Sequence, residues 1–204
     1  MKKTLTVLLA LVLVIAMSVA GTMAYLTSED SVTNTFTVGK VQITLDEAKV
    51  NEYGQKLKAD NTVAEEGDTL ADRVDENTYK LIPGHEYVKD PVIHFQPKSE
   101  ASWLFVKVEN GIKDIVAATT IEDQITSAPN SWTLLTGTNN VYYKSVSANT
   151  SETAAVDYPV FGSFTLKSDA NVAAYKDAKI VVTAYAIQAE GFGTAEAAWT
   201  EVSK

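Results

Sequence analysis

Apolar and polar residues alternate along most of the chain after residue 35, and this alternation predicts β-strands. We expect strands at residues 35–45, 88–95, 102–109, 132–135, 141–145, 159–166 and 179–188. In residues 179–188, positions of both parities are apolar, which is typical of a strand covered on both faces, and this segment is the expected central strand. Short strands separated by loops indicate an all-β fold, an antiparallel jelly-roll β-sandwich with a few short helices.

Gly39 and Pro91 modify this strand pattern. The apolar parity of residues 35–45 changes at Gly39, which predicts a β-bulge. Pro91 has no N–H to donate, so the strand at residues 88–95 should lie at a sheet edge or begin after the proline.

Helices should be few and short. Thr120 followed by Asp123 is a capping signature, and it predicts a short helix that begins after Thr120. Further candidates are residues 70–74, 172–176 and 195–202, the last with Thr194 as its N-cap residue.

Residues 46–80 are rich in acidic side chains and poor in branched apolar ones, so we expect an acidic surface insertion there. Calcium prefers carboxylate oxygens, and the candidate ligands are Glu65, Glu66, Asp68, Asp72 and Asp75. Their spacing is not that of an EF-hand, and a run of charges is ordinarily a solvated face. No cofactor or metal is therefore assigned.

The N-terminus has the pattern of a secretory signal peptide. Lys2 and Lys3 precede an almost wholly apolar run over residues 5–20, and small residues follow at Thr22 and Ala24. We expect cleavage between Ala24 and Tyr25, which removes residues 1–24 and leaves residues 25–204 as a single secreted domain. A cut after Ala20 and a retained membrane anchor are the alternatives.

Composition excludes several classes of chemistry. The 204-residue chain has no cysteine, so thiolate metal sites, cysteine catalysis and disulfides are all excluded. Its stability must come from apolar packing and sheet hydrogen bonds. A formal net charge of −9 without a basic patch argues against nucleic acid as a partner.

The residues offer little support for an enzyme. The two histidines, His85 and His94, do not form the His-Glu-x-x-His pattern of zinc proteases, although His85 precedes Glu86. Pro91 and the Pro-Gly turn before His85 break any helix that would align them. There is neither a Gly-x-Ser-x-Gly elbow nor a glycine-rich phosphate loop, so no catalytic or cofactor-binding residues are predicted.

Two other features have both a functional and a structural interpretation. Trp103, Trp132 and Trp199 suit a platform for sugars or peptides, but they equally suit the core of a sandwich or the cover of its edges. Lys89 followed by Asp90 suggests an intramolecular amide cross-link of the kind found in some surface fibres. Adjacent residues cannot pair in this way, and the sequence does not name the partners.

The junction of leader and mature chain carries a family resemblance. The segments concerned are residues 21–30 (GTMAYLTSED) and 34–41 (NTFTVGKV), with further similarity at residues 89–91, 105–110 and 184–188. They resemble the TasA/camelysin family of exported Gram-positive proteins. The resemblance implies a leader cut by a signal peptidase of the endoplasmic-reticulum type and a mature chain that starts with an aromatic residue, here Tyr25.

The resemblance also implies a jelly-roll subunit of extracellular biofilm-matrix fibres. Such subunits lend their N-terminal strand to the next copy, a form of β-augmentation that does not close and so builds a filament. In this chain the donor would be residues 25–38, with these large apolar side chains: Tyr25, Leu26, Val32, Phe36 and Val38. The partners would be further copies and other matrix proteins. The alternative is that this segment is the first strand of its own sandwich.

Two other functions stay open. Camelysin is classed as a metallopeptidase, which suggests a secreted zinc protease, although this chain lacks the usual zinc motif. A secreted module that binds glycans or proteins through loops near Trp132 and Trp199 is the third hypothesis.

Overall fold

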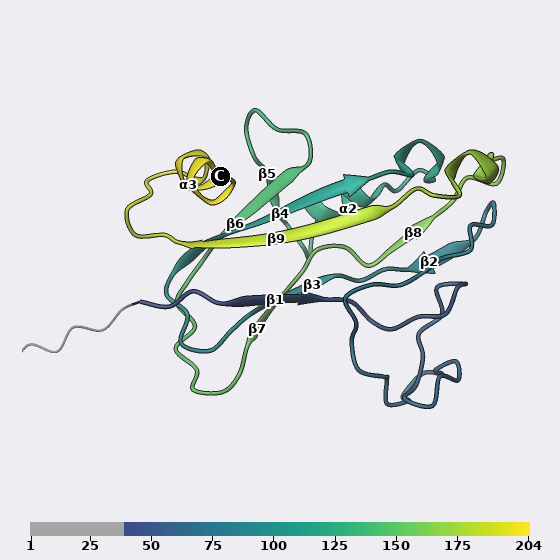
Figure 1. Ribbon diagram of the computed structural model, residues 1–204, viewed down its shortest axis with the longest axis horizontal. Helices are drawn as coiled ribbons and strands as arrows, with labels where there is room; N and C mark the ends of the chain where they lie inside the picture. The colour runs from purple at the N-terminus through teal and green to yellow at the C-terminus, as the bar shows by residue number, and fades with distance from the viewer. Residues whose placement is uncertain (1–38) are drawn as a thin grey trace, which may run out of the picture. The chain divides into compact units, whose positions relative to one another are not determined.

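The computed structural model describes residues 39–204. The strands of this region are all antiparallel and lie in three sheets (Figure 1). The first sheet has the order β1-β3-β7, with β1 at Ile43–Asp46, β3 at Val92–Phe95 and β7 at Val156–Pro159. The second pairs β2 (Glu86–Val88) with β8 (Ser163–Thr165). The third has the order β5-β6-β4-β9, with bounds Thr133–Leu134, Val141–Val146, Ser102–Asn110 and Ile180–Gln188.

Helices are short, as expected. They are η1 (Lys113–Ile115), α2 (Ile121–Thr126), η2 (Val172–Tyr175) and α3 (Ala195–Val202). The predicted mostly β, antiparallel class is confirmed. Within residues 39–204, no helix has the length and the apolar character needed to cross a membrane.

The capping predictions for α2 and α3 are confirmed. The Thr120 side chain accepts from the Asp123 N–H while the Asp123 side chain accepts from the Thr120 N–H, a complete capping box. The Thr194 side chain accepts from the N–H of Ala197 at the start of α3. The helix predicted at residues 70–74 is wrong, because Leu70 and Val74 instead form isolated bridges to other parts of the insertion.

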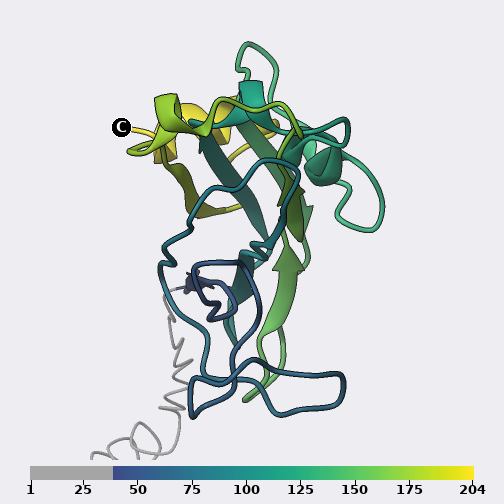
Figure 2. The ribbon, with the colours of Figure 1, turned by 90° about the vertical axis from the view of Figure 1, so that its right-hand side faces the viewer.

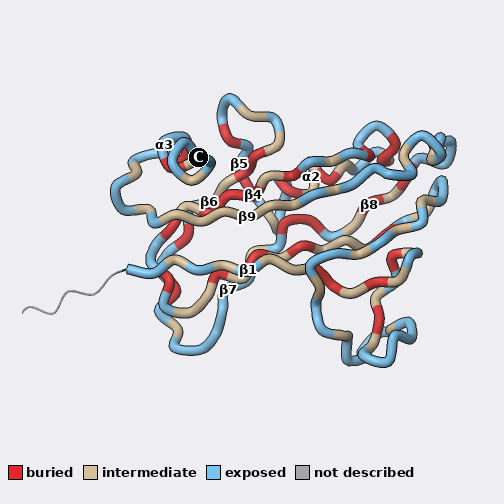
Figure 3. The backbone as a smooth tube through the Cα atoms, viewed as in Figure 1, coloured by how far each residue is buried: buried red, intermediate tan, exposed pale blue. Residues whose placement is uncertain are grey.

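The large core lies between the first and third sheets (Figure 3). Its fully buried side chains include Ile93, Phe95, Leu104, Val106, Trp132 and Phe164. A smaller cluster under α3 contains Phe105, Leu135, Val141, Ala195 and Ala198. Burial of each large apolar side chain contributes about 1.5–3 kcal/mol, so these two clusters stabilise a chain that has no disulfide.

The central strand is β4, which pairs with β6 on one side and β9 on the other. The prediction that residues 179–188 are central is wrong, because β9 lies at the edge of its sheet. Ile180 and Val182 pack against the large core, while Tyr185 and Ile187 pack against the cluster under α3. Apolar residues on both faces of β9 therefore indicate that both faces are packed. They do not indicate whether one strand or two pair with β9.

Pro91 acts as predicted, since β2 ends at Val88 and β3 begins after the proline at Val92. The strand expected at residues 159–166 is split instead. Its first part belongs to β7, and its second part, β8, pairs with β2 in a different sheet. Gly39 precedes β1 and lies in no strand, so the predicted bulge is not formed there.

The insertion at residues 46–80 consists of loops held by isolated bridges (Figure 2). Glu47 bridges Val74, and Lys58 bridges Leu70. Most of the segment lies on the surface, but Glu47 and Leu57 are buried. The insertion is therefore packed onto the domain at its base.

Candidate functional site

A groove of about 720 Å³ lies beside the edge strands β1 and β9. β1 and β9 contact one another, and each pairs with only one strand of the described residues. The apolar residues that line the groove include Leu45, Ile112, Phe164, Ile180 and Val182. Charged residues of both signs also line it: Asp46, Glu47, Asp75, Glu76, Asp177, Lys89, Lys176 and Lys179. A sheet edge that pairs with one strand only can accept an added strand, and side-chain pockets beside it can hold that strand's side chains.

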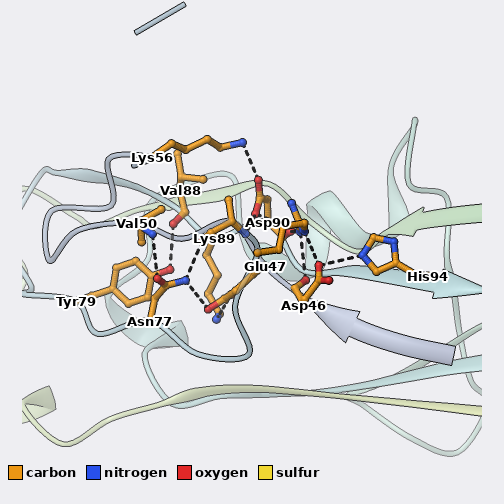
Figure 4. Close-up of polar contacts among 12 residues, drawn as sticks. Asp46, Glu47, Val50, Lys56, Asn77, Tyr79, Val88, Lys89, Asp90 and His94 are labelled. Carbon is orange, nitrogen blue, oxygen red and sulfur yellow. Dashed lines mark hydrogen bonds and ion pairs between the residues drawn. The ribbon is translucent and has the colours of Figure 1, made fainter. Parts of the chain in front are cut away.

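One part of the groove holds a polar cluster of Glu47, which is buried, with Asn77 and Lys89, which are partly buried (Figure 4). Lys89 Nζ donates to Oε2 of Glu47 over 2.6 Å, and Nδ2 of Asn77 donates to Oε1 of the same carboxylate over 2.9 Å. The exposed fraction is 11% for the Lys89 side chain and 5% for that of Glu47. The carboxylate thus bridges an amine and an amide away from bulk water.

Backbone contacts position each member of this cluster. Glu47 follows β1, and its N–H and C=O both bond to Val74 at 2.8 Å. Lys89 follows β2, and its N–H donates to the carbonyl of Gly162 over 3.1 Å. The Asn77 carbonyl Oδ1 accepts from the Val50 N–H at 3.0 Å. Three segments far apart in sequence therefore meet at one carboxylate.

Tyr79 forms an aromatic wall beside this cluster. Its ring centroid lies 5.9 Å from Lys89 Nζ, and its hydroxyl donates to the carbonyl of Val88 over 3.0 Å. Burial, followed by the negative charges of Glu47 and Asp90, raises the pKa of the Tyr79 hydroxyl far above its usual range. Tyr79 therefore stays neutral, and its ring limits the access of water to the amine.

A second polar cluster joins the first sheet to the insertion. His94 lies between two carboxylates, with Nε2 at 2.9 Å from Asp46 Oδ1 and Nδ1 at 2.6 Å from Asp157 Oδ1. Arg73 also pairs with Asp46 and donates to the carbonyl of Asp90 over 2.7 Å. Burial opposes charge on both His94 and Asp46, but their hydrogen bonds outweigh it. The pKa of His94 is raised and that of Asp46 is lowered.

The candidate metal residues of the sequence have separate partners. His85 Nε2 lies 2.9 Å from the carbonyl oxygen of Tyr53, Glu86 accepts from the Ser163 hydroxyl over 3.1 Å, and His94 sits between its two aspartates. Across residues 39–204, no group of three or more histidine, aspartate and glutamate side chains is arranged to hold a metal ion.

The acidic side chains proposed for calcium are spread along the insertion. Asp68 accepts from the Glu65 N–H over 3.0 Å and pairs with Lys58 at 3.4 Å. The remaining candidates, Glu66, Asp72 and Asp75, are all exposed. These contacts are typical of a solvated loop that is stabilised by hydrogen bonds and ion pairs within the insertion.

The three tryptophans pack in the structure rather than forming one platform. Trp132 is 2% exposed, and its indole N–H donates to the carbonyl of Pro159 over 2.9 Å. Trp103 and Trp199 pack around the cluster under α3. The interpretation of these residues as core and edge cover is therefore confirmed.

The remaining predicted site residues lie outside the described region. These are the cleavage pair Ala24 and Tyr25 and the donor residues Leu26, Val32, Phe36 and Val38. The Glu47–Asn77–Lys89 cluster, in contrast, was not predicted as a set. The sequence indicated only Lys89, as a candidate for an amide cross-link beside Asp90. The fold brings Glu47 and Asn77 to it.

Comparison with protein-family models, curated proteins and solved structures found no match to this chain. The resemblance to the TasA/camelysin family therefore rests on the sequence segments quoted above, and what it implies is carried forward as a proposal.

Proposed function

We propose that this chain is a secreted structural subunit of extracellular matrix or surface fibres, without enzymatic activity, that assembles by N-terminal donor-strand exchange. The observation that supports the proposal is that β9 pairs only with β4 among residues 39–204, and that the start of β9 lines a groove of mixed apolar and polar character. The fold proposed with it is a jelly-roll sandwich. Two antiparallel sheets that enclose one core support it, as does the passage of the chain from β7 to β8 between sheets.

The proposed occupant of the groove is residues 25–38 of a second copy. β9 is nine residues long and hydrogen-bonds only to β4 within the described chain, so its outer edge offers main-chain groups to a further strand. Val32, Phe36 and Val38 share one parity, and a strand would direct them to one face. That face would pack on the groove lined by Ile180 and Val182.

Charge does not select the occupant, because the groove carries both signs. Its charged residues are Asp46, Glu47, Asp75, Glu76, Asp177, Lys89, Lys176 and Lys179. The contact is heterologous, because donor and acceptor surfaces differ, so each added copy presents a new donor or acceptor and a filament results.

The test is assembly of the exported protein with and without its donor segment. Filaments of the mature chain should be visible by electron microscopy, and deletion of residues 25–34 should leave a folded monomer by light scattering and circular dichroism. Val182→Asp should block assembly at the acceptor, whereas Val156→Asp, at an exposed valine on β7, should leave it unchanged. Filaments that persist after the deletion would contradict strand donation.

The zinc protease and the binding module are not proposed, because no contact among residues 39–204 specifically favours either of them.

A further inference from the structure

The buried carboxylate of Glu47 contacts both the amine of Lys89 and the amide of Asn77. Lys89 Nζ contacts Oε2 at 2.6 Å, and Asn77 Nδ2 contacts Oε1 at 2.9 Å. We propose that Lys89 Nζ and Asn77 Cγ form an intramolecular amide bond, with Glu47 as the carrier of the proton. The proposal does not rest on fibre assembly, although these three residues line the groove proposed as the acceptor.

The amine of Lys89 is largely shielded from water. The Lys89 and Glu47 side chains are 11% and 5% exposed, and the Tyr79 ring covers the amine at 5.9 Å. Oε2 of Glu47, 2.6 Å from Nζ, is in place to accept a proton from the amine as it attacks. A neutral, desolvated lysine amine has a free lone pair and is a nucleophile.

Backbone hydrogen bonds hold the amide of Asn77 in place. The Val50 N–H donates to Oδ1 of Asn77 over 3.0 Å, so it polarises the carbonyl and is in place to stabilise the oxyanion that forms when Cγ is attacked. Nδ2 also donates to the carbonyl of Ala48 over 2.9 Å. The amide plane is therefore held by three contacts, with its nitrogen directed at Glu47.

The two oxygens of Glu47 suit the two proton transfers that the reaction requires. Oε2 faces the attacking nitrogen and takes its proton, while Oε1 faces the leaving nitrogen and delivers one. Attack forms the Nζ–Cγ bond, and collapse of the tetrahedral intermediate breaks the Cγ–Nδ2 bond. In sum, the Lys89 ammonium and the Asn77 carboxamide become one secondary amide and one ammonium ion, and the Glu47 carboxylate is restored. No oxidant, metal or energy source is consumed.

The amide bond would take the place of a disulfide, which this chain cannot form. The chain has no cysteine, so no disulfide can tie the insertion to the sandwich. An amide between Asn77, in the insertion, and Lys89, after β2, would join these segments beside the end of β1.

Lys56 and Asp90 provide a matched control. Their ion pair is also short, 2.8 Å, but Lys56 is 36% exposed, and the Asp90 carboxylate additionally contacts Ala48 N and Arg73. No further carboxylate bridges the two groups in the described contacts. This pair should remain an ordinary ion pair.

The test is tryptic peptide mapping of the purified full chain by mass spectrometry. Residues 74–80 should be found joined to residues 81–98, with Lys89 uncleaved and a combined mass reduced by one ammonia relative to the two separate amide-bearing peptides. Lys89→Arg and Asn77→Ala should each abolish the joined species, and Lys56→Arg should retain it. Glu47→Gln, which keeps the shape but not the base, should reduce its yield at least tenfold.

Folding of each variant is checked by circular dichroism. Trypsin cleavage after Lys89 in the folded wild-type chain, with residues 74–80 recovered unmodified, would overturn the cross-link. A full yield of the joined species in Glu47→Gln would overturn the role of Glu47.

Discussion

His94 Nε2 lies 2.9 Å from Asp46 Oδ1, and this contact ties β3 to the last residue of β1. The opposite ring nitrogen lies 2.6 Å from Asp157, which faces His94 directly across the β3–β7 pairing. One imidazole thus connects all three strands of the first sheet. Cross-strand pairs of opposite charge stabilise a sheet when the histidine is protonated.

Stability should fall as pH rises through the raised pKa of His94. Because the folded-state pKa lies above the ordinary value of 6.5, the contribution is fully present below that value and is lost as the imidazolium deprotonates. The thermal midpoint should therefore drop by a few degrees between about pH 6 and pH 8.5. Differential scanning calorimetry across this range measures the drop, and His94→Gln should flatten it. An equal drop in His94→Gln would assign the effect to another group.

The buried ion pair of Glu47 and Lys89 should be more costly to break than to replace. With Asn77→Ala present, so that the proposed amide cannot form, Glu47→Leu leaves the Lys89 ammonium buried without its carboxylate and should lower the free energy of unfolding by about 3 kcal/mol. Glu47→Leu combined with Lys89→Met should recover part of that loss, because no buried charge remains. Urea denaturation of these variants measures both. Lys98→Met, in an exposed pair with Glu152, should change stability little.

The capping box of α2 should stabilise the domain measurably. Thr120→Ala removes the acceptor for the Asp123 N–H and should cost about 1 kcal/mol, whereas Thr120→Ser keeps the hydroxyl and should cost much less. Chemical denaturation distinguishes these variants. Equal losses for alanine and serine would mean that the methyl group of Thr120, not its oxygen, matters.

Local signals in the sequence were sufficient where neighbours along the chain decide the structure. The α2 cap depends on Thr120 and Asp123, three positions apart, and the start of β3 depends on Pro91 alone. Such features could be predicted because their physical cause lies within one turn or one strand. The position of β9 could not, because the same apolar pattern suits an edge strand whose two faces are both packed.

The candidate site depends on contacts that the sequence does not encode locally. Glu47 and Lys89 are 42 positions apart, and Glu47 and Asn77 are 30 apart. Each is unremarkable in its own segment, and a charged residue in a polar insertion is normally exposed. The bridge between Glu47 and Val74 and the hydrogen bonds of Asn77 to Val50 and Ala48 hold these side chains together.

Gly54 shows how closely the insertion is packed onto the sandwich. Its φ is +74°, and a Cβ added there would lie 2.7 Å from Cα of Tyr87, a contact with backbone that cannot move aside. Gly54→Ala should therefore lower the free energy of unfolding by more than the roughly 1 kcal/mol expected for a left-handed alanine alone. Gly67→Ala is the matched control, because Gly67 has a φ of +90° with nothing within 4 Å of the added carbon. Urea denaturation of both variants separates the close approach from the backbone strain that they share, and equal losses would mean that the insertion moves away from β2 at no cost.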